Sequence, residues 1–291
     1  MTIREALPRS AKQIEKAAGS WQLAWTEAEL LLSTVLNKDR TWLVAHNETK
    51  LTTTQKKAFD RLTKRRAKHE PIAYLTGSKP FYGRDFSVTK HVLIPRPETE
   101  ELVEHVLLAT PKPDLIWDVG TGSGAIAVTL KAECPKATVF ASDVDTRAIA
   151  VAKRNAKSLL KKSSAIHFFK GNLLTPQIQN AILKHKPKHL TIVANLPYLP
   201  LSDKKVLTKD VVSFEPSKAL FTKDDGLFLI QKLLQQLSPW LNKQGIAASI
   251  WCEFDPPQAK TLKRLAQNHF PKAKVTIYQD GCSRDRTLSI T

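Results

Sequence analysis

Short apolar segments alternate with longer amphipathic segments from residue 114 to the end of the chain. The short segments have the length and composition of buried strands, and the longer ones have the periodicity of helices. Such an alternation favours a doubly wound α/β domain. Strands are expected at residues 115–119, 138–142, 166–169, 190–194, 245–251 and 275–279, and helices at 125–132, 148–160 and 226–241.

The first 76 residues have helical patterns and carry no catalytic motif. Thr26 followed by Glu29 fits a capping box at the start of one helix, and Thr52 followed by Gln55 fits a second one. Helices this short must pack on one another to be stable. We therefore expect a small helical domain at residues 1–76.

Residues 77–97 differ in character from the segments on either side. Aromatic, turn and β-branched residues at 81–88 are typical of a β-hairpin, which we expect to link two domains. Pro95 and Pro97 are followed by acidic residues and an amphipathic stretch, a pattern that marks the start of a helix. The second domain is therefore expected at residues 98–291.

A glycine-rich segment follows the first expected strand of this second domain. It consists of Gly120, Thr121, Gly122, Ser123 and Gly124. Glycine lets the backbone approach a ligand closely, and the N-terminus of the next helix offers free N–H groups. The Gly-x-Gly-x-Gly spacing differs from the Gly-x-Gly-x-x-Gly of dinucleotide-binding folds. It therefore favours the carboxypropyl tail of S-adenosylmethionine over a pyrophosphate.

Two residues at the ends of later strands are candidates to contact the same ligand. Asp143 ends the second expected strand, where its carboxylate can accept hydrogen bonds from both ribose hydroxyls; its neighbour Asp145 is better placed to cap the following helix. Asn172 follows the third expected strand and could contact adenine, or it could be only a turn residue.

The strand at 190–194 is followed by Asn195, Leu196, Pro197 and Tyr198. The Asn side-chain oxygen and the next backbone carbonyl can both accept hydrogen bonds from one NH2 group, which leaves the nitrogen lone pair free to face a methyl donor. The Tyr ring can lie against a flat amide or base. The motif alone also fits an ordinary turn at the end of a strand. Its position after the glycine-rich segment favours a site that methylates a planar nitrogen.

No metal site is expected. His185 and His189 have the spacing of metal ligands, but Pro187 interrupts any helix between them, so a basic loop is favoured. The three cysteines are far apart and lack a Cys-x-x-Cys pair, which indicates reduced thiols.

Lys and Arg number 45 against 27 Asp and Glu, which gives a formal net charge of +18. This excess favours contact with nucleic acid or the ribosome, although a solvated lysine-rich surface has the same composition. No apolar run approaches the roughly 20 residues of a membrane span, and the N-terminus lacks an apolar signal core. We therefore expect a cytoplasmic protein without membrane contact, and we expect it to act as a monomer.

Taken together, these motifs resemble the release factor glutamine methyltransferases, which are S-adenosylmethionine-dependent protein-(glutamine-N5) methyltransferases. The resemblance covers nearly the whole chain, and the Ile-Pro-Arg-Pro-Glu-Thr-Glu segment at 94–100 is its most specific part. Further matching segments lie at residues 83–88, 118–127, 214–216, 219–220, 225–227, 280–281 and 285–286.

The resemblance implies a fold and a reaction. The fold has a helical N-terminal domain that docks the release factor, a β-hairpin linker, and a Rossmann-like, seven-stranded class I methyltransferase domain with a reversed last hairpin. The reaction methylates the side-chain amide nitrogen, N5, of the glutamine in the Gly-Gly-Gln motif of class 1 peptide chain release factors. S-adenosylmethionine is the donor, and no metal takes part.

The resemblance also assigns site residues. The donor would contact Gly120, Thr121, Gly122, Ser123, Gly124, Asp143, Asn172, Leu173 and Asn195. The glutamine would be bound by Asn195, Leu196, Pro197 and Tyr198, of which Asn195, Pro197 and Tyr198 are the catalytic candidates.

At two positions the chain departs from the family. The family usually has Asn-Pro-Pro-Tyr, whereas Leu196 here gives the Asn-Leu-Pro-Tyr familiar from ribosomal RNA adenine dimethyltransferases, and Asn172 stands where an acid is common. The runner-up function is therefore an rRNA or DNA adenine or cytosine N-methyltransferase, which would use the same motif on a flipped base. A third hypothesis is a ribosome-associated binding protein that keeps the donor fold without catalysis.

Overall fold

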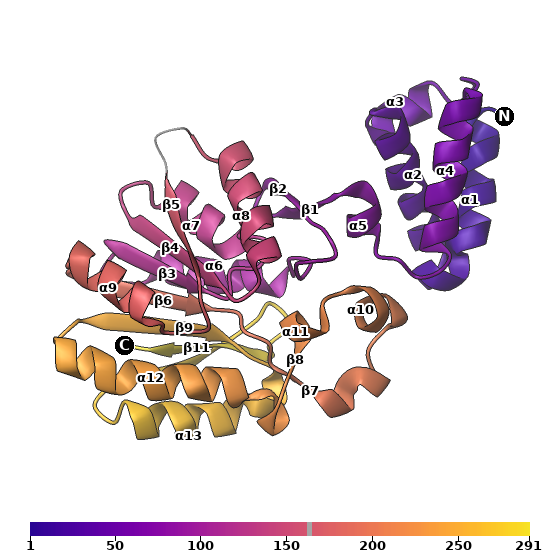
Figure 1. Ribbon diagram of the computed structural model, residues 1–291. Helices are drawn as coiled ribbons and strands as arrows, with labels where there is room; N and C mark the ends of the chain where they lie inside the picture. The colour runs from indigo at the N-terminus through magenta and orange to yellow at the C-terminus, as the bar shows by residue number, and fades with distance from the viewer. Residues whose placement is uncertain (162–164) are drawn as a thin grey trace. The chain divides into compact units, whose positions relative to one another are not determined.

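The computed structural model describes residues 1–161 and 165–291, and the chain divides into two compact units (Figure 1). The first, the helical unit, comprises Met1–Ser78 together with Leu207–Phe214. The second, the sheet unit, comprises Lys79–Val206 and Glu215–Thr291. Residues 207–214 therefore belong to the helical unit although they lie in the second half of the chain, which the sequence did not indicate.

Apolar side chains from α1, α2 and α4 form the core of the helical unit, as the amphipathic patterns predict. Its helices are α1 (Ile3–Ala18), α2 (Trp21–Leu36), α3 (Arg40–Ala45), α4 (Thr53–Arg66), α5 (Ile72–Thr76) and α10 (Lys209–Phe214). A buried ion pair joins α4 to α2, with Arg66 Nε 2.7 Å from Glu27 Oε2.

Of the two capping boxes predicted in this unit, one is confirmed and one is wrong. Thr52 and Gln55 cap α4 reciprocally, as expected. Thr26 lies inside α2 instead, because the chain turns at Gly19 and the Ser20 hydroxyl already accepts the hydrogen bond that caps this helix. Glu29 is used elsewhere, in an ion pair with Arg40.

The sheet unit begins with the expected hairpin and contains a seven-stranded sheet within its described residues. The hairpin consists of β1 (Ser78–Phe81) and β2 (Arg84–Ser87). The sheet has the order β10-β11-β9-β6-β3-β4-β5, and β11 runs antiparallel to both of its neighbours. The strands are β3 (Leu115–Val119), β4 (Thr138–Asp143), β5 (Ile166–Lys170), β6 (Leu190–Ala194), β9 (Ala248–Glu253), β10 (Val275–Gln279) and β11 (Asp285–Ile290).

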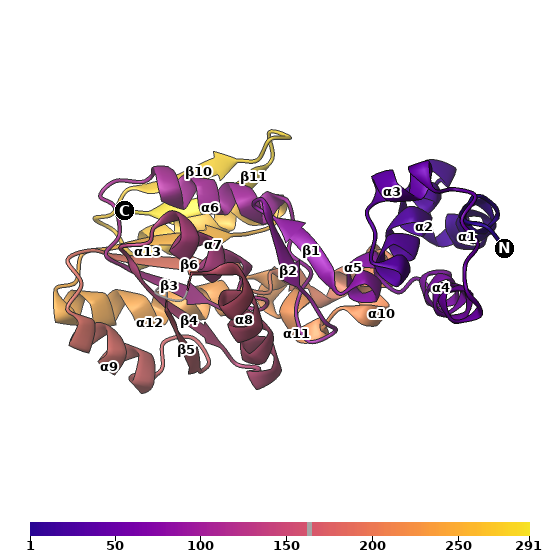
Figure 2. The ribbon, with the colours of Figure 1, turned by 90° about the horizontal axis from the view of Figure 1, so that it is seen from above.

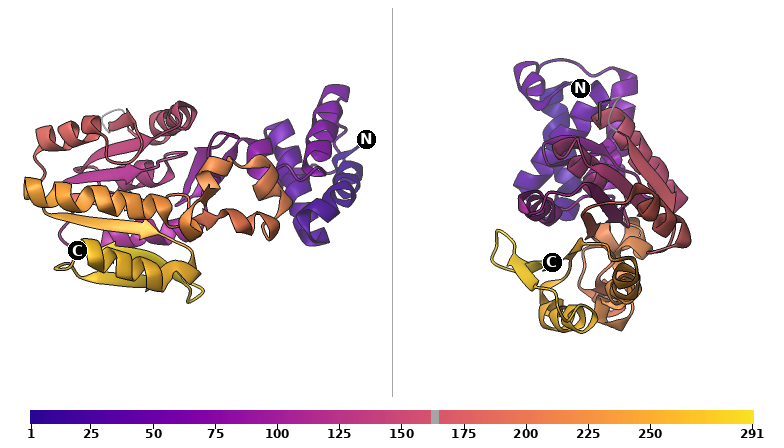
Figure 3. Two further views of the ribbon diagram at one scale, coloured as in Figure 1. Left: turned by 60° about the horizontal axis from the view of Figure 1, so that its bottom comes forward. Right: turned by 90° about the vertical axis from the view of Figure 1, so that its left-hand side faces the viewer.

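Helices cover both faces of this sheet (Figures 1 and 2). One face carries α6 (Glu98–Leu108), α7 (Ala125–Glu133) and α8 (Thr146–Leu159); the other carries α9 (Pro176–His185), α12 (Phe228–Gln244) and α13 (Ala259–His269). Figure 3 shows α12 and α13 side by side. Because strand side chains alternate, Trp117 packs on the second set while Ile116 packs on the first. The Rossmann-like α/β fold predicted from the sequence is thus confirmed, whereas α9, α13 and β11 were not among the elements expected from the residue pattern.

The segment around the two spaced histidines is helical only up to His185, where α9 ends. The backbone N–H groups of Lys188 and His189 then donate to the Asp114 carboxylate, which fixes a basic loop. Among the described residues, no group of three or more His, Cys, Asp or Glu side chains is arranged to hold a metal ion. Within residues 1–161 and 165–291, no helix is both long and apolar enough to cross a membrane.

Candidate active site

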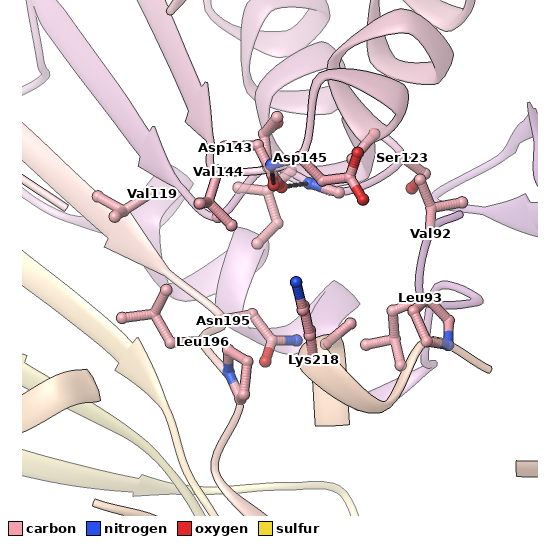
Figure 4. Close-up of a pocket in the computed structure, with 18 of the residues that line it drawn as sticks. Val92, Leu93, Val119, Ser123, Asp143, Val144, Asp145, Asn195, Leu196 and Lys218 are labelled. Carbon is pink, nitrogen blue, oxygen red and sulfur yellow. Dashed lines mark hydrogen bonds between the residues drawn. The ribbon is translucent and has the colours of Figure 1, made fainter. Parts of the chain in front are cut away.

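A pocket lies at the carboxyl ends of β3, β4 and β6, the edge where ligands bind in open α/β sheets. Figure 4 shows Ser123 and Asp143 on one side of it and Asn195, Leu196 and Lys218 on the other. Most of the predicted site residues line this pocket, namely Gly120, Thr121, Gly122, Ser123, Asp143, Asn172, Leu173, Asn195, Leu196 and Pro197. Gly124 and Tyr198 do not line it.

The glycine-rich segment adopts a conformation that requires its glycines. Gly120, Gly122 and Gly124 have φ values of 77°, 56° and 82°, in the left-handed region. A Cβ on Gly120 would stand 2.9 Å from Leu196 Cδ2, and one on Gly124 would stand 3.0 Å from the Ala152 Cβ. Gly120 therefore lets the segment pack directly on Leu196 of the Asn195 motif, which comprises residues 195–198. Gly124, by contrast, lets the segment pack closely against α8.

The buried carboxylate of Asp118, in β3, anchors the glycine-rich segment by hydrogen bonds. Its Oδ2 accepts hydrogen bonds from Thr121 Oγ1 at 2.6 Å and from the Ala127 N–H at 3.2 Å. Its Oδ1 is buried and has no hydrogen-bond partner among the described residues. Burial raises the pKa of Asp118 to about 7. The sequence placed Asp118 at the end of the strand but indicated no such role.

Asp143 connects β4 to the same segment. Its Oδ2 accepts from the Gly122 N–H at 2.9 Å, and its Oδ1 accepts from the Asp145 N–H at 2.8 Å. Burial raises the pKa of Asp143, although both hydrogen bonds oppose this shift. Each carboxylate oxygen can accept a second hydrogen bond, so the side chain can still bind a ligand. Asp145 caps α8 as predicted, by accepting from the Arg147 N–H.

The Asn195 side chain is held by two partners that the sequence did not reveal. Its Nδ2 donates to Thr99 Oγ1 and to Glu253 Oε2, at 2.9 Å in each case. Its Oδ1 has no hydrogen-bond partner in the part of the chain that the structure describes, and Asn195 is only partly buried and lines the pocket. Oδ1 is therefore the atom of this amide that is available to a ligand in the pocket.

The sheet register places Glu253 beside Asn195, whereas Thr99 comes from the first turn of α6. Ala194 of β6 pairs with Cys252 of β9, so the residues that follow them, Asn195 and Glu253, are neighbours. Glu253 is almost fully buried and accepts from Thr99 Oγ1 at 2.7 Å and from the Tyr198 hydroxyl at 3.0 Å. Burial raises the pKa of Glu253.

A buried ion pair joins two of the sequence motifs that are far apart in the chain. Glu215 accepts from the Ile94 N–H at 3.0 Å and from Arg96 Nη2 at 2.6 Å. Its side chain is almost fully buried, whereas Arg96 also lines the pocket. Ile94 and Arg96 are thereby fixed next to Glu215 at one wall of the pocket.

Comparison with known proteins identifies the family. Residues 5–77 match the PrmC N-terminal domain, and residues 98–198 match the methyltransferase small domain. A release factor glutamine methyltransferase from Staphylococcus aureus is 35% identical over 264 residues, which cover 91% of each chain. Another from Neisseria gonorrhoeae is 39% identical over 269 residues, which cover 92% of this chain and 93% of the relative.

The chain belongs to the release factor glutamine methyltransferase family. It is thus a methyltransferase, and the family implies S-adenosylmethionine as the methyl donor. Among solved structures, the hMettl16 catalytic domain in complex with a MAT2A 3'UTR hairpin has a TM-score of 0.55 and 18% identity, and the likeness covers 72% of this chain and 76% of that one. At such low identity the likeness shows the fold alone.

In this family member the backbone of Tyr198 is fixed from two sides. Gln258 Nε2 donates to the Tyr198 carbonyl oxygen at 2.7 Å and to the Asp225 carbonyl oxygen at 2.8 Å. Gly226, with φ 86°, approaches so closely that a Cβ on it would stand 1.8 Å from the Tyr198 oxygen. Tyr198 is thus held by its hydroxyl and its carbonyl, and the packing of its ring on a substrate amide stays a prediction.

Replacing Gly226 with Ala is expected to lower the free energy of unfolding by roughly 2–4 kcal/mol, because backbone strain and overpacking each cost about 1–2 kcal/mol or more. Methyl transfer should fall as well, since the Asn195 motif must shift. Gly245→Ala is the matched control: Gly245 has φ 63°, but no atom lies within 4 Å of the place that a Cβ would take, so only strain applies. Urea unfolding of both variants checks this; equal losses of stability would refute the close approach.

Proposed function

We propose that this chain transfers a methyl group from S-adenosylmethionine to the side-chain N5 of the glutamine in the Gly-Gly-Gln motif of class 1 peptide chain release factors. The observation that carries the proposal is the Asn195 amide, whose Nδ2 is occupied by Thr99 and Glu253 while Oδ1 has no partner among the described residues. An acceptor fixed beside the glycine-rich segment suits the NH2 group of an amide substrate. The family relatives support the choice of substrate.

In the proposed donor site, the glycine-rich segment receives the carboxypropyl end of S-adenosylmethionine. Asp143 would accept hydrogen bonds from the ribose hydroxyls through the lone pairs that Gly122 and Asp145 leave free. Asn172 and Leu173 line the pocket beyond β5 and would contact adenine. The residues present therefore fit this donor, which supplies a methyl group on a positively charged sulfur.

The chain's own contribution to the proposed reaction is positioning. The lone pair of an amide nitrogen is delocalised into its carbonyl, so the nitrogen must be held against the methyl carbon. Asn195 Oδ1 and the Leu196 carbonyl would accept its two hydrogens. Pro197 restricts the backbone of Leu196 and so fixes the direction of that carbonyl. Such positioning is worth ~7 kcal/mol or more. No strong base is needed, because the nitrogen becomes far more acidic once it bonds to the methyl carbon.

The function is tested with labelled S-adenosylmethionine and two acceptors in parallel, a purified class 1 release factor and ribosomal RNA. Label on the Gly-Gly-Gln glutamine alone, and none on a release factor in which that glutamine is replaced, supports the proposal. Label on RNA alone would overturn it in favour of a nucleic-acid N-methyltransferase, the function to which Leu196 points. Binding of the donor without transfer to either acceptor would favour a non-catalytic role.

We assign docking of the release factor to the helical domain at residues 1–76, with residues 77–97 as the linker and 98–291 as the methyltransferase domain. Apolar side chains on α2 and α3 support a docking surface, since Leu23 and Val44 are 56% and 67% exposed. We also propose that the protein acts as a monomer, because the residues that line the pocket all come from the sheet unit. The release factor methyltransferases among its relatives support a cytoplasmic location.

A second contact, with the phosphate backbone of RNA, is proposed for a basic groove formed by α4 and the turn that follows it. Lys57, Arg61, Lys64 and Lys68 line one shallow groove, and no ion pair to them occurs among the described residues. The two other charged residues of the groove are already paired: Asp60 lies 3.9 Å from Arg9, and Arg65 binds Glu70. Unpaired cations at helical spacing suit a row of phosphates.

Changing these four residues to Gln is expected to weaken the binding of ribosomal RNA about tenfold or more at low salt, and to flatten its dependence on salt. Fluorescence anisotropy at several salt concentrations measures both quantities. The control changes the net charge equally by replacing four exposed lysines of the sheet unit, Lys243, Lys260, Lys263 and Lys272, with Gln. Equal losses in the two variants would mean that net charge, and not this groove, binds RNA.

A further inference from the structure

We propose that Glu253 and Thr99 are positioning residues that lock the Asn195 amide in one of its two orientations, with Oδ1 turned to the substrate. This inference rests on the proposed function, because it explains how Asn195 Oδ1 is oriented to accept a hydrogen bond from the substrate glutamine. Neither residue is part of the Asn-Leu-Pro-Tyr motif, and Glu253 lies outside the lining of the pocket. Both act through Asn195.

The number of available hydrogens decides the orientation. The Thr99 hydroxyl has a single hydrogen, which it donates to Glu253 Oε2 at 2.7 Å. Towards Asn195 the Thr99 oxygen can therefore only accept a hydrogen bond, and Glu253 Oε2, which receives the Thr99 hydrogen, is likewise an acceptor. Both atoms lie 2.9 Å from the same corner of the Asn195 amide. That corner must be the NH2 group, because a carbonyl oxygen there would face two acceptors.

The alternative orientation would be costly and unproductive. Rotation of the amide by half a turn would bring Oδ1 against Glu253 Oε2 and Thr99 Oγ1, so that three acceptors would share the single Thr99 hydroxyl hydrogen. It would also present NH2 to the pocket, where it would meet the NH2 group of the glutamine. An asparagine at the surface loses little by such a flip, since water can satisfy either orientation. Here the buried carboxylate at the end of β9 removes that freedom.

The same carboxylate connects Asn195 with Tyr198. Glu253 Oε1 accepts a hydrogen bond from the Tyr198 hydroxyl at 3.0 Å, while Oε2 accepts hydrogen bonds from Asn195 Nδ2 and Thr99 Oγ1. One side chain of β9 thereby fixes the first and the last residue of the motif. The Leu196 carbonyl, the second acceptor proposed for the glutamine, lies between these two fixed points. Its direction therefore depends on Glu253 as well.

A matched pair at Thr99 tests the inference. Thr99→Val keeps the shape of the side chain but removes the hydroxyl, whereas Thr99→Ser keeps the hydroxyl. We expect Thr99→Val to lower kcat with the release factor about tenfold or more, and Thr99→Ser to stay within about threefold of the wild type. The affinity for S-adenosylmethionine should change less than about twofold in either variant. Thr129→Val controls for loss of a buried hydroxyl, because the Thr129 hydroxyl has no partner among the described residues.

A second readout does not depend on activity. In 15N-labelled protein, the side-chain NH2 signals of Asn195 are identified as the pair missing from Asn195→Ala. With two acceptors on that group, we expect slow hydrogen exchange in the wild type and in Thr99→Ser. Exchange should be at least about tenfold faster in Thr99→Val and in Glu253→Gln, because the Gln amide can offer NH2 in place of an acceptor.

The two readouts separate the inference from the proposed function. Wild-type protein that fails to methylate a release factor would refute the function, while the exchange rates would still report the locked amide. Unchanged kcat in Thr99→Val, or unprotected Asn195 NH2 signals in the wild type, would overturn the positioning role. Should Thr99→Val fail to fold, Glu253→Gln provides the same two measurements.

Discussion

Replacing Asn195 with Ala is expected to lower methyl transfer to the release factor on the order of 1,000-fold, while the affinity for S-adenosylmethionine changes less than about threefold. The side chain contributes an acceptor that the proposed mechanism needs only when the amide nitrogen is aligned for attack. Its loss therefore affects kcat more than donor binding. The variant also leaves Thr99 and Glu253 with one donor fewer, which adds to the loss of alignment.

Single-turnover transfer and calorimetric titration of the donor measure the two quantities separately. Asn242→Ala is a suitable control, since Asn242 is exposed near the end of α12 and lies away from the pocket lining. Donor affinity that falls together with transfer would place Asn195 in the donor site. That outcome would contradict the proposed role of Asn195 in binding the substrate amide.

The opposite pattern is expected for Asp143→Ala. Donor affinity should fall roughly 100-fold, because hydrogen bonds to a charged group contribute about 1.5–3 kcal/mol each and the ribose would lose this acceptor. The Gly122 N–H would also lose its partner, which loosens the glycine-rich segment. At saturating donor, kcat should recover to within about tenfold of the wild type.

Titration of the donor, followed by transfer assays at rising donor concentration, checks this expectation. Asp85→Ala serves as the control, because Asp85 is an exposed carboxylate on β2 that does not line the pocket. A kcat that stays low at every donor concentration would mean that Asp143 acts in the transfer step and not in binding. An unaltered affinity of Asp143→Ala for S-adenosylmethionine would show that Asp143 does not bind the donor.

Features that depend on local sequence were predictable. The central strands match their apolar runs because a strand buried on both faces needs apolar residues throughout, as in Leu115–Val119 and Leu190–Ala194. The glycine-rich segment was recognisable because its positive φ values exclude most other residues. Thr26 shows where local patterns fail: its spacing to Glu29 fits a cap, but Ser20 after the turn at Gly19 starts the helix earlier.

The sequence by itself determined the fold class, the family resemblance and the two segments that form the centre of the pocket, 120–123 and 195–197, because each depends on residues close together in the chain. Only the tertiary structure revealed the partners of those residues. Glu253 lies 58 positions from Asn195, and Thr99 lies 96 positions from it. No local pattern encodes such a contact. The Glu253 contact arises because parallel pairing sets β6 beside β9 in one register, and the Thr99 contact arises because α6 packs against β9. Burial then requires the polar groups brought together there to find hydrogen-bond partners.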